Sequence, residues 1–128
     1  MRYTTHYTRE EARALLPKVR TWLKRLNQCR VALEKYDEKI ASARTPSGDL
    51  GGKLVNDWAR TLTDARSLLL EFSSREIEIK DLSRGLIDFP AIIDDKEVYL
   101  CWEDGEEDIE YWHDLESGYA GRVKIEED

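Results

Sequence analysis

The feature that most constrains this chain is a regular series of apolar residues that begins at Ala12 and ends at Ile40. Its spacing alternates between three and four residues, which places every member on one face of an α-helix and repeats as a heptad. The members are Ala12, Leu15, Val19, Trp22, Leu26, Cys29, Leu33, Tyr36 and Ile40. Thr8 and Glu11 precede the series with the S/T-x-x-E spacing of a capping box. The pattern therefore predicts one long helix from about Thr8 to Ser42.

A turn and a second helix follow. Residues 42–52 contain Pro46 and three glycines, which is a turn signal. The heptad then resumes, with members Val55, Trp58, Leu62, Ala65, Leu69, Phe72 and Ile79, while a second apolar stripe holds Leu54, Leu68, Leu70 and Ile77. Glu76 occupies one position of the series where an apolar residue is expected. We expect it to lie beyond the end of the helix bundle or to pair with an arginine of a partner, such as Arg13. The two helices form an antiparallel hairpin over residues 8–84.

After Gly85 the hydrophobic period changes to two. Residues 86–93, 97–102 and 108–114 alternate as β-strands do, and the connections between them are short. They predict a three-stranded antiparallel meander over residues 85–115, followed by a loop-like tail at 116–128. We therefore expect a single α+β domain over residues 1–128: a long antiparallel helical hairpin followed by a small three-stranded antiparallel β-meander.

Charge is divided between the two ends of the chain. The whole sequence has 20 Lys and Arg against 27 Asp and Glu, a net charge of −7. Residues 1–52 carry 11 basic and 6 acidic side chains, and residues 53–128 carry 9 and 21. The two parts can face each other within one chain or across a dimer. As an alternative, the first helix can bind RNA or the ribosome through Arg20, Lys24, Arg25 and Arg30, although the net negative charge of the chain disfavours a nucleic-acid partner.

Several features favour the cytoplasm. No apolar run is long enough to span a bilayer, and the first residues lack the apolar core of an export signal. Cys29 and Cys101 lie far apart in different kinds of segment, which suits free thiols in a reducing compartment.

The length of the helices predicts an assembly. A helix of about 35 residues is about 52 Å long, too long for a small sheet to cover. The remaining apolar surface needs a second protein surface, and a four-helix bundle made from two hairpins is the simplest closed solution. We therefore expect a homodimer, and the candidate interface residues are Trp22, Trp58, Leu68 and Phe72.

Several short motifs resemble one bacterial family. They are Thr8–Ala12 with Leu15-Leu16-Pro17, Gly85–Pro90, Cys101-Trp102 with Gly105-Glu106, and Trp112-His113-Asp114 before Gly118. In this order they look like the family catalogued as domain of unknown function 2203, over residues 7–122. The resemblance implies a small soluble prokaryotic protein and carries no activity.

The strongest chemical candidates are Asp88, Cys101, Glu106 and His113. Neighbouring strands of a meander can bring these side chains together, and they are ligand types for zinc or iron. Their spacing matches no compact metal motif. The alternative is structural: a buried thiol, two turn-capping carboxylates and a hydrogen-bonded histidine.

No nucleophile, phosphate-loop or deaminase motif is present, so we expect a non-enzymatic protein without a cofactor. Tyr99, Trp102, Tyr111 and Trp112 are candidates for a surface that binds a basic protein. The leading interpretation is a cytoplasmic dimeric interaction or adaptor protein. The alternatives are a metal- or thiol-dependent site on the meander and association with RNA through the first helix.

Overall fold

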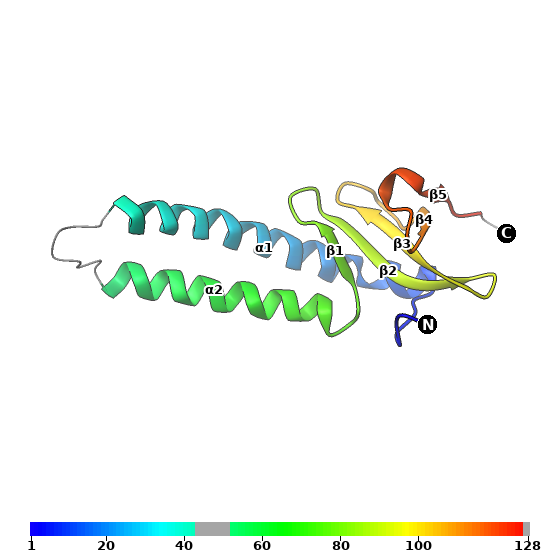
Figure 1. Cartoon of the computed structure of the whole chain (residues 1–128), viewed down its shortest axis with the longest axis horizontal. Helices are drawn as coiled ribbons and strands as arrows, with labels where there is room; N and C mark the ends of the chain where they lie inside the picture. Colours follow the sequence, from blue (N-terminus) through cyan, green and yellow to red (C-terminus); the bar gives the residue numbers. More distant parts are fainter. Residues whose placement is uncertain (43–51, 127–128) are drawn as a thin grey trace.

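The structure is a computed structural model that describes residues 1–42 and 52–126. Two helices, α1 (Arg9–Ser42) and α2 (Gly52–Ser73), lie side by side as a long hairpin, and a sheet packs at one end of it (Figure 1). The strands are β1 (Glu78–Asp81), β2 (Leu86–Ile93), β3 (Lys96–Glu103), β4 (Tyr111–Asp114) and β5 (Val123–Lys124), with a 3₁₀ turn, η1 (Tyr119–Gly121), before β5. The predicted α+β class is confirmed.

The start of α1 follows from its capping box. The backbone N–H of Thr8 donates to the Glu11 carboxylate at 3.0 Å, and the N–H of Glu11 donates to Thr8 Oγ1 at 3.1 Å. These two bonds satisfy donors that a helix start leaves without a partner in the helix.

Neither α1 nor α2, as far as the structure describes them, is long and apolar enough to cross a membrane.

The sheet has five strands rather than the three expected. Its order is β1-β2-β3-β4-β5 and every neighbouring pair is antiparallel, so it is a meander. The first additional strand lies in residues predicted to continue the second helix, which ends at Ser73 instead of near Gly85. The second lies in the tail predicted to be a loop. The third predicted strand, 108–114, is shorter than expected, and most of the predicted turn at 42–52 lies outside the described residues.

Glu76 marks the end of the helical region. Its φ of 59° is a left-handed conformation, which no helix continues through. Its carboxylate accepts hydrogen bonds from the N–H groups of Thr4 and Thr5 and from the Thr4 hydroxyl. Glu76 therefore lies past the end of α2 rather than within a longer helix, as the heptad had predicted. It anchors the N-terminal segment, whereas Arg13 binds Asp108 of the same chain.

The core lies between the first half of α1 and the inner face of the sheet. On the helix it contains Ala12, Leu16, Val19, Trp22, Leu23 and Leu26, and on the sheet Ile87, Phe89, Ala91, Val98, Leu100 and Trp102. Between Leu26 and Leu68, none of the described residues is fully buried. The outer half of the hairpin extends beyond the sheet as two helices that cover only each other (Figure 1).

Part of the basic helix faces the acidic part of the same chain. Arg13 makes a bidentate pair with Asp108 at 2.7 and 2.8 Å, and Arg9 donates to the Ile109 carbonyl at 2.6 Å. Arg20 contacts the carbonyls that follow β3 and lies over the Trp102 ring. For these three arginines, the expected pairing of basic and acidic segments occurs within one chain.

Candidate functional site

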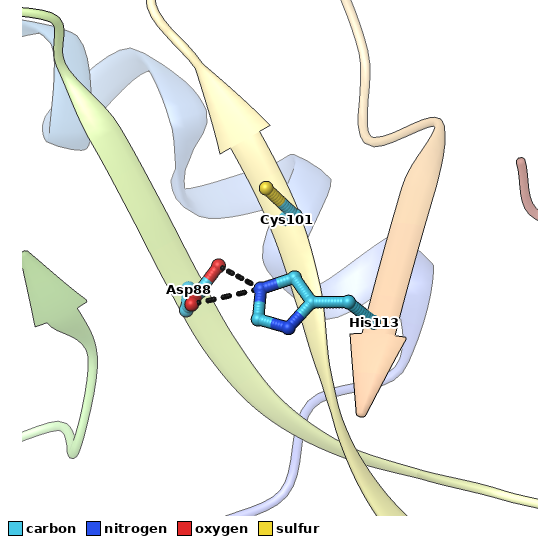
Figure 2. Close-up of side chains that lie close together, drawn as sticks. All are labelled: Asp88, Cys101 and His113. Carbon is cyan, nitrogen blue, oxygen red and sulfur yellow. Dashed lines mark hydrogen bonds and ion pairs between the residues drawn. The ribbon is translucent and has the colours of Figure 1, made fainter. Parts of the chain in front are cut away.

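Three predicted site residues meet on the face of the sheet opposite α1. Asp88 on β2 is directly opposite Cys101 on β3, and His113 on β4 is opposite Tyr99, the neighbour of Cys101 on the same face. The alternation of side chains along each strand therefore directs all three to one side (Figure 2). One ligand atom from each lies within 4.8 Å of the others, and no other such group of three occurs in the described residues.

His113 makes the closest contacts in this cluster. Its Nε2 lies 3.0 and 3.1 Å from the two carboxylate oxygens of Asp88 (Figure 2), and its Nδ1 lies 2.7 Å from the carbonyl oxygen of Asp114. The Asp88 and His113 side chains are each 2% exposed, and Cys101 is fully buried. The cluster is therefore a buried histidine–carboxylate pair with a thiol beside it.

Burial controls the protonation of this cluster. It raises the pKa of Asp88, although the His113 ring and its hydrogen bond act in the opposite direction. Burial, together with the negative charge of Asp88, raises the pKa of Cys101 to about 12. The Cys101 thiol is then protonated at neutral pH and is a poor nucleophile. Thiol catalysis is the chemistry that this arrangement supports least.

Aromatic side chains and a cation cover the cluster. The Tyr99 ring packs against His113 with ring centres 5.4 Å apart, and Tyr3 packs edge-on against Tyr99 at 5.7 Å. The Tyr3 hydroxyl bonds to that of Tyr99 and donates to Glu78. Arg122 from the C-terminal segment lies close to Cys101 and stacks 4.0 Å from the Tyr111 ring. The sequence carried no signal for Tyr3 or Arg122, because their roles depend on how the two ends of the chain cross the sheet.

Glu106, the fourth predicted site residue, lies outside the cluster. Its carboxylate accepts the N–H of Glu103 at 2.7 Å and pairs with Arg122 at 3.1 Å. Glu106 therefore closes the turn after β3, as the structural alternative held, and reaches Cys101 only through Arg122.

The four aromatic candidates for partner binding do not form one surface. Tyr99 and Trp102 are buried on opposite faces of the sheet, and the Trp102 indole N–H donates to the Glu106 carbonyl at 2.9 Å. Tyr111 lies beneath Arg122, and Trp112 is half-buried against the core.

The four interface candidates separate in a similar way. Trp22, Leu68 and Phe72 belong to the core of the single chain, where the Trp22 and Phe72 rings meet at 5.4 Å. Trp58 lies in the outer hairpin and is half-buried.

Of the four RNA-binding candidates, Arg20 and Arg30 have partners within the chain, and Lys24 and Arg25 are exposed.

A second histidine–carboxylate pair was missed from the sequence. His6 Nε2 lies 2.7 Å from the Glu97 carboxylate, which also accepts the N–H groups of Arg2 and Tyr3. Burial alone would raise the pKa of Glu97, but the hydrogen bonds from His6, Arg2 and Tyr3 outweigh it and lower the pKa to about 2. Glu97 therefore holds the N-terminal segment against the sheet.

Glu97→Gln is expected to destabilise the protein at neutral pH and to have a diminishing effect in acid. Because the folded pKa is lowered from 4.5 to about 2, the stabilisation is fully present above about pH 4.5 and is lost as the pH falls toward 2. Urea unfolding midpoints of the two proteins should therefore converge over this range. Glu116→Gln is the control, because Glu116 pairs with Arg2 at a position 85% exposed and should change the midpoint little. A constant gap between wild type and Glu97→Gln down to about pH 2 would contradict this assignment.

Comparison with known proteins identifies one matching family. A family model described as "Uncharacterized conserved protein (DUF2203)" matches residues 5–125. Searches of curated proteins and of solved structures found no match.

Proposed function

This chain belongs to the DUF2203 family of uncharacterised conserved proteins, and from its structure we propose that it is a non-enzymatic, dimeric interaction protein. In this proposal the outer hairpin pairs with that of a second copy. The sheet then remains free to present its acidic side chains to a basic protein partner. The two free thiols, Cys29 and Cys101, suit the cytoplasm as the working compartment.

An apolar stripe on α2 is the observation that supports the proposal. Val55, Leu62 and Leu69 recur every seven residues, and Val55 and Leu69 are 37% and 46% exposed. At 100° per residue they lie on one flank of α2, beside the residues that face α1. The opposite flank is charged and holds Asp57, Arg60, Asp64 and Glu71. The flank that holds Val55, Leu62 and Leu69 also carries Ala59 and Arg66, so its apolar surface consists of these three large residues spaced one heptad apart.

A second copy of the chain is the partner that matches this stripe best. The stripe is symmetric about Leu62, so an antiparallel α2 of a second copy places its Leu69 beside Val55 and its Leu62 beside Leu62. Such self-complementarity is what a two-fold interface requires. Charge favours the same arrangement: α2 carries three basic and three acidic residues, whereas residues 74–128 carry 6 basic and 18 acidic ones. Antiparallel pairing joins the neutral helices and keeps the acidic sheets at opposite ends.

Leu62→Glu is expected to dissociate the proposed dimer. The substitution places two carboxylates near the two-fold axis, where each would lose water without gaining a partner, so the dissociation constant should rise about tenfold or more. Sedimentation velocity over a concentration series measures this directly. Ser67→Glu adds the same charge at an exposed position away from the stripe and should leave the association unchanged.

Two results would count against the proposal. A wild-type protein that stays monomeric throughout the concentration series removes the dimer altogether. A wild-type dimer that Leu62→Glu and Ser67→Glu weaken equally places the interface on another surface.

A further inference from the structure

We propose that Asp88, Cys101 and His113 form a zinc-binding site on the outer face of the sheet. The site is independent of the proposed dimerisation, since its three residues lie on the strands and the apolar stripe lies on α2. It requires one imidazole nitrogen, one carboxylate oxygen and one thiolate sulfur, a ligand set that suits Zn²⁺ among the divalent ions.

The hydrogen bonds of His113 prepare Nε2 as a ligand. The Asp114 carbonyl oxygen can only accept, so the Nδ1 atom that lies 2.7 Å from it carries the ring proton. The lone pair of Nε2 then points at Asp88, and the space between Nε2 and the carboxylate must hold either another proton or a cation. A backbone carbonyl that fixes the far nitrogen in this way is the usual support of a metal-binding histidine.

The spacing of the three ligand atoms fits a tetrahedral ion after small shifts. Bond lengths of about 2.0 Å to nitrogen and oxygen hold these two atoms about 3.3 Å apart, and a sulfur at 2.3 Å lies about 3.5 Å from each. The Nε2 and Asp88 oxygen atoms are now 3.0–3.1 Å apart, and all three ligand atoms lie within 4.8 Å. The zinc geometry is reached when the Asp88 oxygen moves a few tenths of an ångström away from His113 Nε2 and the Cys101 sulfur moves closer to both atoms. The three residues supply three of the four ligands of a tetrahedral zinc site.

The charges around the site also balance. Zn²⁺ replaces two protons, the one shared by His113 and Asp88 and the one on the Cys101 thiol, and both leave to solvent. The resulting carboxylate and thiolate neutralise the ion. Arg122, beside Cys101, stabilises a thiolate sulfur.

Titration of the metal-free protein with Co²⁺ tests the proposal. Co²⁺ adopts zinc geometry and has visible absorption bands that are intense only in tetrahedral sites, together with a near-ultraviolet band that requires a thiolate ligand. We expect both bands to saturate at one equivalent per chain and to disappear when Zn²⁺ is added.

Matched variants identify the ligands. Cys101→Ser should abolish the thiolate band, whereas Cys29→Ser, which changes the other free thiol, should keep it. His113→Gln should weaken binding by more than the 10- to 100-fold that loss of a supporting residue costs. His6→Gln removes the other histidine–carboxylate pair, which has no cysteine in its cluster, and should leave binding unchanged.

The wild-type titration can overturn the proposal without any variant. If no tetrahedral Co²⁺ spectrum develops at several equivalents, the three residues are a structural ion pair with a buried thiol. A spectrum that survives in Cys101→Ser and is lost in Cys29→Ser assigns the metal to another place. Dimerisation is measured separately, so either result leaves that proposal intact.

Discussion

His113→Ala is expected to lower the free energy of unfolding of the metal-free protein by about 3–5 kcal/mol, which is the usual effect of removing one partner from a buried ion pair. The substitution leaves the Asp88 carboxylate 1% exposed, where only the Cys101 thiol and the charge of Lys80 still favour its ionised form. It also opens a cavity beside Tyr99, whose ring packs on His113. Urea unfolding at neutral pH measures this loss, and the slope of the unfolding free energy against urea concentration should stay the same in both proteins.

The pH dependence separates the charge effect from the cavity effect. Burial raises the pKa of Asp88 in the folded protein, so ionising this carboxyl reduces stability as the pH rises from its unfolded value through the folded one. Without His113 the pKa rises further. The loss caused by His113→Ala should therefore be smaller at about pH 4 than at pH 7. An equal loss at both values would show that packing alone is responsible.

A double-mutant cycle is the control for the pair itself. Asp88→Ala together with His113→Ala should destabilise the protein by less than the sum of the two single variants, because the second substitution removes the unpaired group that the first one left. Additive losses would contradict a direct interaction. The pair His6 and Glu97 offers a comparison at a more exposed position, where the corresponding coupling should be smaller.

Local sequence patterns predicted both helices and three of the five strands, but not β1, β5 or the end of α2. The Thr8–Glu11 capping box and the heptad after it located α1 because both signals depend on neighbouring residues. The error at β1 arose from following the heptad through Ile79. The alternation of Glu76, Ile77, Glu78 and Ile79 is a strand pattern, and in the structure this segment pairs with β2.

Which residues belong to the candidate cluster depends on the register with which β4 pairs with β3. Alternation along β3 placed Cys101 and Tyr99 on one face, but the face of His113 depends on how the chain crosses between β3 and β4. That connection is longer than a tight hairpin, and Arg9, Arg13 and Arg20 of α1 hold it. These contacts join residues far apart in sequence, so no local pattern could distinguish His113, which is in the cluster, from Glu106, which is not.

Phe72→Ala is expected to destabilise the monomer by about 3–5 kcal/mol, whereas Leu69→Ala, one turn away on the same helix, should change its stability by no more than about 0.5 kcal/mol. The heptad in the sequence assigns both residues to one series. In the structure Phe72 is 1% exposed and packs edge-on against Trp22, while Leu69 is 46% exposed. Equilibrium unfolding in urea, at a concentration where the protein is monomeric, compares the two variants.

The same pair of variants connects this packing with the proposed function. α2 carries two overlapping apolar stripes, and only the one that contains Leu68 and Phe72 is buried within the chain. If the stripe that contains Leu69 binds a second copy, Leu69→Ala should weaken association while it leaves the monomer stable. Phe72→Ala should destabilise the monomer and, under conditions where the variant is still folded, leave the association unchanged. Equal losses of monomer stability would mean that Leu69 is buried in the single chain in solution. The apolar flank on which the dimer depends would then not exist.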